Sequence, residues 1–393
     1  MQADALVRYA ETYATPLYVY DAERIRTQYR KLSAVDAKLF YAMKANYNPD
    51  ILRVLLDLGA GIDAVSLGDV LLARKIGFSK ERILYTANRT RDEELDQVYQ
   101  MGVLCNLGSL SQLARFARRH PGARVCVRLN PMIQAGEHER VVTAGENSKF
   151  GVPLTRLSEL LGIVAAEGLN VVGVHEHAGS GIPESVEMIK GMENVLAVLD
   201  RFPDLEFVDF GGGFKVAYAP GEAEFDHKRF AAEVNARFAA ACGERDLEMR
   251  FEPGKYLVAQ AGTLLVTVTD VTATPHKILV GVDSGFPQLI RPMFYGAYHR
   301  IENLSNPNGE RHLYDVVGNI CESGDSFATE RPLPEVREGD VLAIRDAGAY
   351  CASMGGVYNQ RPMPAELLVD TEDRFRRAAT FHELAEAAAA RAE

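Results

Sequence analysis

The feature that most constrains the fold is an alternation of short apolar segments with helical patterns between Leu39 and Phe251. Each apolar segment ends in small or polar residues, which is typical of a buried strand. Eight segments fit this description: Leu39–Met43, Gly61–Val65, Arg82–Tyr85, Val103–Asn106, Arg124–Leu129, Asn170–Val174, Phe207–Phe210 and Glu248–Phe251. Eight strands alternating with helices predict a parallel (β/α)₈ TIM barrel. A doubly wound open sheet is the alternative, but it usually has a Gly-x-Gly-x-x-Gly turn after its first strand, where this chain has Lys44.

The pattern changes after Gly254, where strands follow one another without long helices between them. The segments that read as strands are Gly262–Val271, Lys277–Val282, His312–Gly318, Asp340–Arg345 and Ala365–Val369. Turn signals separate them, so we predict a second, mainly antiparallel β domain, a barrel or a sandwich. The charged, alanine-rich segment Thr371–Glu393 predicts a helix at the end of the chain.

Composition excludes several classes of function. The 393 residues suffice for about two domains. A net charge of −11 argues against nucleic acid and against an anionic membrane surface as partners. The five cysteines are scattered without a Cys-x-x-Cys pair, which fits a reducing compartment and offers no zinc site. With no signal-peptide pattern and no apolar run long enough to span a membrane, we expect a cytoplasmic protein.

The functional groups of a (β/α)₈ barrel lie at the C-terminal ends of its strands. At those positions the sequence has one lysine, a histidine pair, a glycine triplet and several polar residues: Lys44, Asp63, Thr86, Asn106, Asn130, His175, His177, Gly211–Gly213 and Glu252. We expect these groups to converge on one mouth of the barrel, and their convergence is more informative than any single member.

Lys44 follows an apolar strand and precedes the break at Asn48-Pro49. Burial there would lower the pKa of its ammonium, and a neutral amine is a nucleophile toward carbonyls. Position alone favours the other interpretation, a lysine whose charged end reaches solvent from the end of a strand.

Three further motifs each admit more than one interpretation. The glycines Gly211–Gly213 can cradle a phosphate with their backbone N–H groups, or they can form a tight turn. The pair His175 and His177 can chelate a metal, can be a hydrogen-bonded core pair, or can place one imidazole on a planar cofactor whose substituents Ser180 holds. Metal is the weaker choice because the other histidines are badly placed to complete a site. Glu252 can hydrogen-bond a protonated ring nitrogen, although Glu-Pro-Gly is also an ordinary turn.

Together with motifs of the β domain, these motifs occur in one order: Tyr41–Asn46, His177–Ser180, Gly211–Gly213, Glu252–Gly254, Cys321–Asp325 and Gly348–Tyr350. The set resembles the fold-type III pyridoxal-phosphate decarboxylases from about Pro16 to Asp370. Around Arg291, Tyr295 and Tyr358–Pro362 the chain is more similar to the subfamily that converts meso-diaminopimelate to L-lysine and carbon dioxide than to ornithine or arginine decarboxylases. Decarboxylation of ornithine, lysine or carboxynorspermidine is the alternative, and a metal-dependent barrel hydrolase is the rival from another class.

The resemblance implies roles for the barrel residues. Lys44 would hold pyridoxal 5'-phosphate covalently through its amine, His177 would stack on the ring, and Glu252 would pair with the ring nitrogen. The full set implied for the cofactor is Lys44, Asp63, His177, Ser180, Gly211, Gly212, Gly213, Glu252, Lys255 and Tyr350. In the family an arginine usually stands where this chain has Lys255, and a lysine lacks the two-pronged grip of an arginine on a carboxylate.

The resemblance also implies roles outside the barrel and a domain division. Cys321 would donate the proton to the product, and the substrate would contact Lys255, Arg291, Tyr295, Glu322 and Tyr350. Cys321 and Glu322 would reach the cofactor of a second copy, which implies a homodimer. Because the N-terminal strand of this family joins the β domain, we expect the barrel over residues 26–256, and the β domain with its C-terminal helix over residues 1–25 and 257–393.

Overall fold

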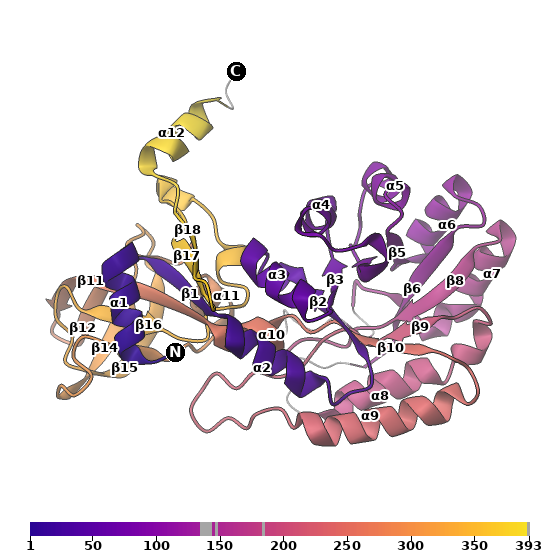
Figure 1. Ribbon diagram of the computed structural model, residues 1–393, viewed down its shortest axis with the longest axis horizontal. Helices are drawn as coiled ribbons and strands as arrows, with labels where there is room; N and C mark the ends of the chain where they lie inside the picture. Colours follow the sequence, from indigo (N-terminus) through magenta and orange to yellow (C-terminus); the bar gives the residue numbers. More distant parts are fainter. Residues whose placement is uncertain (134–143, 146–147, 183–184, 391–393) are drawn as a thin grey trace. The chain divides into compact units, whose positions relative to one another are not determined.

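The computed structural model describes residues 1–133, 144–145, 148–182 and 185–390 (Figure 1). By its packing the chain divides into two units. The barrel unit consists of Arg26–Val216 and Glu224–Tyr256. The β unit consists of Met1–Ile25, Ala217–Ala223 and Leu257–Glu393, so a short segment that is flanked on both sides by barrel residues belongs to the β unit.

The strands of the barrel unit form a closed parallel ring within the described residues. They are β2 (Lys38–Ala42), β3 (Gly61–Ala64), β4 (Ile83–Tyr85), β5 (Leu104–Leu107), β6 (Arg124–Asn130), β8 (Asn170–His175), β9 (Phe207–Asp209) and β10 (Glu248–Phe251). Each pairs with the next, and β10 pairs back with β2. A two-residue strand, β7 (Val152–Pro153), pairs in parallel with the end of β6. The predicted (β/α)₈ barrel is confirmed, and every strand begins and ends within one residue of its prediction.

Helices lie between the strands and cover the outside of the barrel (Figure 1). They are α2 (Ala22–Leu32), α3 (Pro49–Asp57), α4 (Leu67–Ile76), α5 (Asp92–Gln100), α6 (Leu110–Arg119), α7 (Leu157–Glu167), α8 (Ser185–Leu196), α9 (His227–Cys242) and the short α10 (Lys255–Val258). Several starts are fixed by capping side chains, because the first backbone N–H groups of a helix lack partners within it. The Asn48 side chain accepts from the Asp50 N–H, and Ser66 and Ser109 accept in the same way at α4 and α6.

The lower interior of the barrel is filled by apolar side chains. The buried cluster there comprises Phe40, Leu84, Cys126, Val172 and Phe207. The guanidinium of Arg250 lies 3.6 Å from the centre of the Phe207 ring and 4.7 Å from that of Phe40, a cation–π arrangement that lets a charged group lie among rings. The barrel interior is therefore a packed core, with the Arg250 guanidinium among its rings and a polar layer at its mouth.

The β unit is built on one mostly antiparallel sheet. Its strands are β1 (Leu17–Asp21), β11 (Gly262–Ala273), β12 (Ile278–Val282), β13 (Ile301–Asn303), β14 (Arg311–Val317), β15 (Ser326–Pro334), β16 (Val341–Ile344), β17 (Ala365–Val369) and β18 (Arg374–Arg376), with helices α1 (Ala3–Tyr13), α11 (Arg291–Tyr295) and α12 (Phe381–Ala389). Strand β1 lies between β11 and β17, which confirms that the N-terminal strand joins this sheet.

The prediction of a helix over Thr371–Glu393 is wrong in its first part. Residues Arg374–Arg376 form β18, in which Phe375 lies opposite Leu367 and stacks on the Tyr13 ring at 4.5 Å. The helix begins only after Thr380, whose hydroxyl accepts from the Glu383 N–H in a capping box. The strand pairing and ring contact of Phe375 thus outweigh a local composition that favours a helix.

Among the described residues, no helix combines the length and the apolar character that crossing a membrane requires.

Candidate active site

The mouth of the barrel is a polar layer directly above the apolar one. Side chains on a strand alternate between faces, so residues two positions further along point into the same interior. On β8 this step leads from Gly173 to His175, and on β9 from Phe207 to Asp209. Strand pairing places His175 beside Asp209, and Asp209 beside the Arg250 that precedes Glu252. Alternation and register therefore bring the ends of separate strands to one place.

Lys44 lies in a single 3₁₀ turn directly after β2. Its amine is 2.7 Å from the Asp63 carboxylate, which is fully buried at the end of β3. The Thr86 hydroxyl donates to the other Asp63 oxygen. The Lys44 side chain is 41% exposed, which agrees with the interpretation of a lysine whose charged end reaches solvent from the end of a strand. Its distinguishing feature is a fixed carboxylate partner at a position that a ligand can reach.

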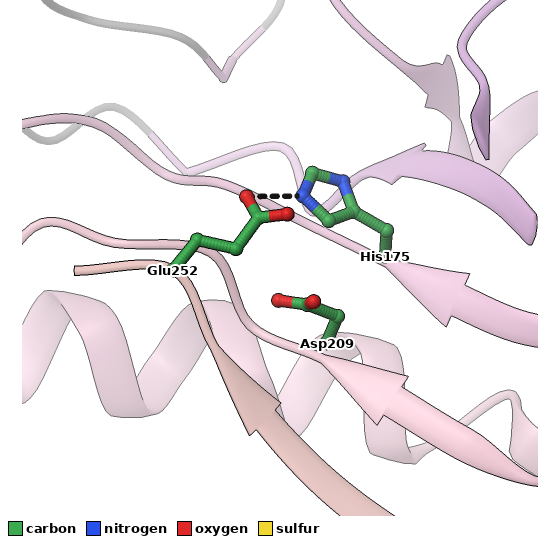
Figure 2. A group of neighbouring side chains, drawn as sticks. All are labelled: His175, Asp209 and Glu252. Atoms are coloured by element: carbon green, nitrogen blue, oxygen red, sulfur yellow. Dashed lines mark hydrogen bonds and ion pairs between the residues drawn. The ribbon is translucent and has the colours of Figure 1, made fainter. Parts of the chain in front are cut away.

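At the ends of β8, β9 and β10, the last of which pairs with β2, His175, Asp209 and Glu252 form a buried group, and Figure 2 shows their side chains turned toward one another. His175 Nε2 is 3.0 Å from Glu252 Oε2. Burial lowers the pKa of His175 to about 4, raises that of Asp209 to about 8, and raises that of Glu252 well above its usual range. The imidazole is therefore neutral at pH 7, and the two carboxyl groups hold their protons far more tightly than exposed ones do.

One polar atom of each of these three side chains has no hydrogen-bond partner among the described residues. These atoms are Nδ1 of His175, Oδ2 of Asp209 and Oε1 of Glu252, and an NH2 group of Arg128 is in the same condition. A buried polar group without a partner costs about 1–3 kcal/mol. Such a concentration of unmet hydrogen bonds is typical of a site that binds a polar ligand.

His177 and the glycine triplet form a second wall. The Gly212 N–H donates to His177 Nδ1 at 3.2 Å, so this nitrogen carries no proton, and burial lowers the pKa of His177. A Cβ on Gly211 would lie 2.7 Å from the Glu176 carbonyl oxygen, and one on Gly212 would lie 2.7 Å from the Glu252 carbonyl oxygen. Only glycine fits at both positions.

The glycine amides differ in their availability. The Gly211 N–H donates to Asp209 Oδ1, and the Gly212 N–H is taken by His177. Within the described part of the chain, only the Gly213 N–H of the triplet has no partner. The Gly213 carbonyl accepts from the Ile182 N–H at 2.9 Å and so ties this loop to the one that carries Ser180. The predicted phosphate cradle thus has one open amide rather than three.

The remaining predicted residues fall into both units. Lys255 follows Glu252-Pro253-Gly254 at the start of α10 and is 6% exposed. The others belong to the β unit: Arg291, Tyr295, Cys321, Glu322 and Tyr350.

Arg291 is a buried residue of the β unit. Its guanidinium lies 3.1 Å from His299 Nε2 and over the Tyr218 ring at 4.5 Å. These contacts hold the guanidinium in a fixed place, as a carboxylate-binding arginine requires.

Cys321 is exposed, whereas the other four cysteines are buried. The Asn359 side-chain amide donates to its sulfur at 3.2 Å, and the Tyr358 hydroxyl donates to Glu322 at 3.1 Å. The segments around Cys321 and Tyr358, far apart in sequence, therefore form one surface of the β unit.

Sequence reasoning missed two buried polar residues of the mouth, Arg128 and Asp209, and also the buried Glu176, whose carboxylate lies next to Gly191 of α8. Arg128 is a charged residue inside the apolar strand β6, and this was a usable signal. Asp209 was hidden because the strand was predicted to run through Phe210, which made Gly211 the strand end. Glu176 lies between two histidines and gave no signal of its own.

Comparison with known proteins identifies the family. Residues 21–259 match the model of the pyridoxal binding domain of pyridoxal-dependent decarboxylases. The diaminopimelate decarboxylase of Methanothermobacter thermautotrophicus is 42% identical, over 97% of this chain and 93% of its own. The chain belongs to the pyridoxal-dependent decarboxylases. The family predicted from the motifs is confirmed.

Two further relatives extend the match over nearly the whole chain. The diaminopimelate decarboxylase of Escherichia coli strain K12 is 35% identical, over 98% of this chain and 96% of its own. The crystal structure of diaminopimelate decarboxylase from Helicobacter pylori complexed with L-lysine superposes with a TM-score of 0.90 at 30% identity, and it covers 98% of this chain and 99% of that one. Both units of this decarboxylase therefore have counterparts in its relatives.

Proposed function

We propose that this chain decarboxylates meso-2,6-diaminopimelate to L-lysine and carbon dioxide, with pyridoxal 5'-phosphate as cofactor, as the last step of lysine biosynthesis. The observation that carries the proposal is the mouth of the barrel. There the Lys44 amine is accessible, and the buried Glu252 has one carboxylate oxygen without a hydrogen-bond partner among the described residues. Its relatives named diaminopimelate decarboxylase match over nearly the whole length, including the β unit that carries Arg291 and Cys321.

The residues at the mouth fit this cofactor. Glu252 Oε1 is a buried acceptor without a partner, and a protonated ring nitrogen would supply the missing donor. Only glycine fits at positions 211 and 212, so no side chain from either residue stands between His177 and a flat ring that would stack on it. The open Gly213 amide suits one phosphate oxygen, and Ser180 and Tyr350 are the side chains we assign to the others.

The chain's own residues then divide the work. Lys44 would hold the cofactor through its amine, and Asp63 fixes that amine in place. Glu252 would keep a proton on the ring nitrogen. Pyridoxal phosphate supplies the electron sink that accepts the electron pair left when the bond between Cα and the carboxylate breaks. The Cys321 thiol would then give its proton to that Cα, and a solvent proton would restore the thiol.

Arg291, Tyr295 and Glu322 would recognise the distal amino-acid end of the substrate, together with Lys255 and Tyr350. Arg291 is the group best suited to its carboxylate, since its guanidinium is already fixed. Lys255 keeps a positive charge near the barrel mouth but binds a carboxylate as a point charge rather than as a fork.

The proposed assembly is a cytoplasmic homodimer in which Cys321 and Glu322 serve the site of the partner. Both residues are exposed in the β unit, and exposed apolar residues of the same unit, among them Met354 and Tyr358, suit a contact with a second copy.

A substrate panel tests the proposed reaction. We expect carbon dioxide release from meso-diaminopimelate to exceed that from ornithine, L-lysine and carboxynorspermidine by at least about a hundredfold, because a buried arginine without its carboxylate is costly. Comparable rates on ornithine would assign the chain to another decarboxylase. A colourless protein that contains stoichiometric zinc would instead favour the metal-dependent hydrolase.

Mixing two inactive variants tests the shared site. Lys44→Ala and Cys321→Ala should each lose most activity, and the Cys321 variant should keep the bound cofactor's spectrum. If sites are shared, unfolding and refolding the two together should restore about a quarter of wild-type activity, because half of the dimers are mixed and each has one intact site. If the refolded mixture recovers no activity, Lys44 and Cys321 act in a site formed by one chain.

A further inference from the structure

His175 is buried at the mouth of the barrel, and the one hydrogen bond of its side chain among the described residues goes to Glu252. We propose that His175 is a positioning residue that holds Glu252 Oε2 through its Nε2, so that Oε1 is turned toward the ring nitrogen of pyridoxal phosphate. This inference rests on the proposed function, which assigns Glu252 to that nitrogen. The inference adds to that function the residue that sets the orientation and the charge of the Glu252 carboxylate.

The geometry leaves Glu252 with one engaged and one open oxygen. Oε2 lies 3.0 Å from His175 Nε2, while Oε1 is buried and has no partner among the described residues. The Glu252 backbone is itself fixed, since its N–H donates to the Gly211 carbonyl at 2.6 Å. With its backbone and Oε2 both held, the carboxylate plane is set, and only Oε1 can serve a ligand.

His175 is held as firmly as the residue it orients. It ends β8, between β6 and β9, and is 1% exposed. Its ring lies in the field of Asp209 and Asp63, which favour a positive imidazole, and of Arg128 and Lys44, which disfavour it. Burial outweighs these charges, so the ring is neutral and carries a single N–H.

A neutral imidazole can serve Glu252 in either protonation state. When Glu252 holds a proton, Oε2 can donate it to an unprotonated Nε2. When Glu252 is ionised opposite a positive ring nitrogen, the other tautomer donates its Nε2–H to Oε2 and stabilises the negative charge. His175 therefore makes the ionised form of Glu252 less costly, and that form is the one that keeps the ring nitrogen protonated.

A cation site is the competing assignment, since the ligand atoms of His175, Asp209 and Glu252 all lie within 4.8 Å of one another. Two of those atoms, Nε2 and Oε2, already bind each other. The hydrogen bond accounts for their closeness without an ion.

Three variants of the holoenzyme test the proposal. His175→Gln keeps an N–H that can reach Oε2. His175→Phe keeps the bulk without a donor, and His175→Asn keeps polarity but is too short. His120→Phe is the matched control, because that histidine pairs with Asp96 Oδ1 at 2.7 Å after α6 in the same unit. For each we would measure bound pyridoxal phosphate, its visible spectrum as a function of pH, metal content, and the kcat and KM of carbon dioxide release.

We expect the Phe and Asn variants to bind cofactor but to lose about tenfold in kcat, with KM within threefold. The pH midpoint of their visible band should move about one unit lower, which corresponds to that tenfold change. His175→Gln and His120→Phe should stay within threefold of wild type, with an unshifted midpoint. Should the Phe variant not fold, the Asn variant decides.

Three results would overturn the proposal. These are an unshifted band in the Phe or Asn variant, an equal loss in all three His175 variants, and a stoichiometric metal that disappears with His175. Failure of the proposed function is visible separately, as a wild-type protein without any visible band that borohydride removes.

Discussion

The barrel mouth contains two groups of side chains, on neighbouring strands, that provide opposite environments, and we call them its open end and its dry end. At one end the Lys44 amine is 41% exposed and paired with Asp63. At the other, His175, Asp209 and Glu252 are buried together, and their equilibria favour neutral forms. The open end is therefore charged and accessible to solvent. The dry end is buried, and its groups favour their neutral forms.

The difference shows how one scaffold can hold two kinds of chemistry. An amine that must exchange partners needs access, and a single fixed carboxylate keeps it in place. A carboxylate that must hold a proton on a ring nitrogen benefits from exclusion of water, since charge interactions strengthen in a low dielectric. Variants at each end should therefore fail in distinct ways.

The largest effect is expected for Lys44→Ala. It removes the amine that holds the cofactor, and carbon dioxide release should fall by about a thousandfold or more. Lys38→Ala is a matched control, because Lys38 begins the same strand and forms an exposed ion pair with Glu248. Steady-state rates would check this. Near-wild-type activity of Lys44→Ala would show that Lys44 takes no part in the reaction.

Glu252→Gln should reduce kcat by about a hundredfold while the protein still binds cofactor, because an amide cannot balance a protonated ring nitrogen. The variant should show an altered visible spectrum, unlike Lys44→Ala, which should show none. Glu248→Gln, four residues earlier on β10, is the control. An unchanged spectrum in Glu252→Gln would mean that the dry end does not contact the ring.

Asp63→Asn should have a smaller effect, a loss of about tenfold in kcat, since the amine stays but its charged partner is gone. Cofactor should also load more slowly, which the growth of the visible band in a mixing experiment would measure. A loss as large as that of Lys44→Ala would instead mean that Asp63 itself takes part in the reaction.

The smallest effect is one of stability, at Glu176 beside the dry end. Burial raises the pKa of Glu176 to about 8, so the folded state holds a proton that the unfolded chain releases near pH 4.5. This group's contribution to stability is present at low pH and is lost as the pH rises from about 4.5 to about 8. Glu176→Gln should thus gain about 3–4 kcal/mol relative to wild type between pH 5 and pH 8, measured by urea unfolding. A difference independent of pH would show that Glu176 titrates normally.

The sequence predicted the barrel well because each strand is a short apolar run between clear breaks, as at Asn48-Pro49. It also placed Lys44, His177 and Glu252 at the mouth of the barrel, because the functional groups of such barrels lie at the C-terminal ends of the strands. It could not predict that His175 meets Glu252, since 77 residues separate them and only register brings them together. In the β unit, β15 was missed because Pro332 and Pro334 argue against a strand.

The most direct test of the account is to identify the residue that carries the cofactor. Purified wild-type protein would be reduced with borohydride, digested, and its labelled peptide sequenced by mass spectrometry. The account predicts a single pyridoxyl group, on Lys44. A label on another lysine, or no label on a folded protein supplied with pyridoxal phosphate, would contradict it.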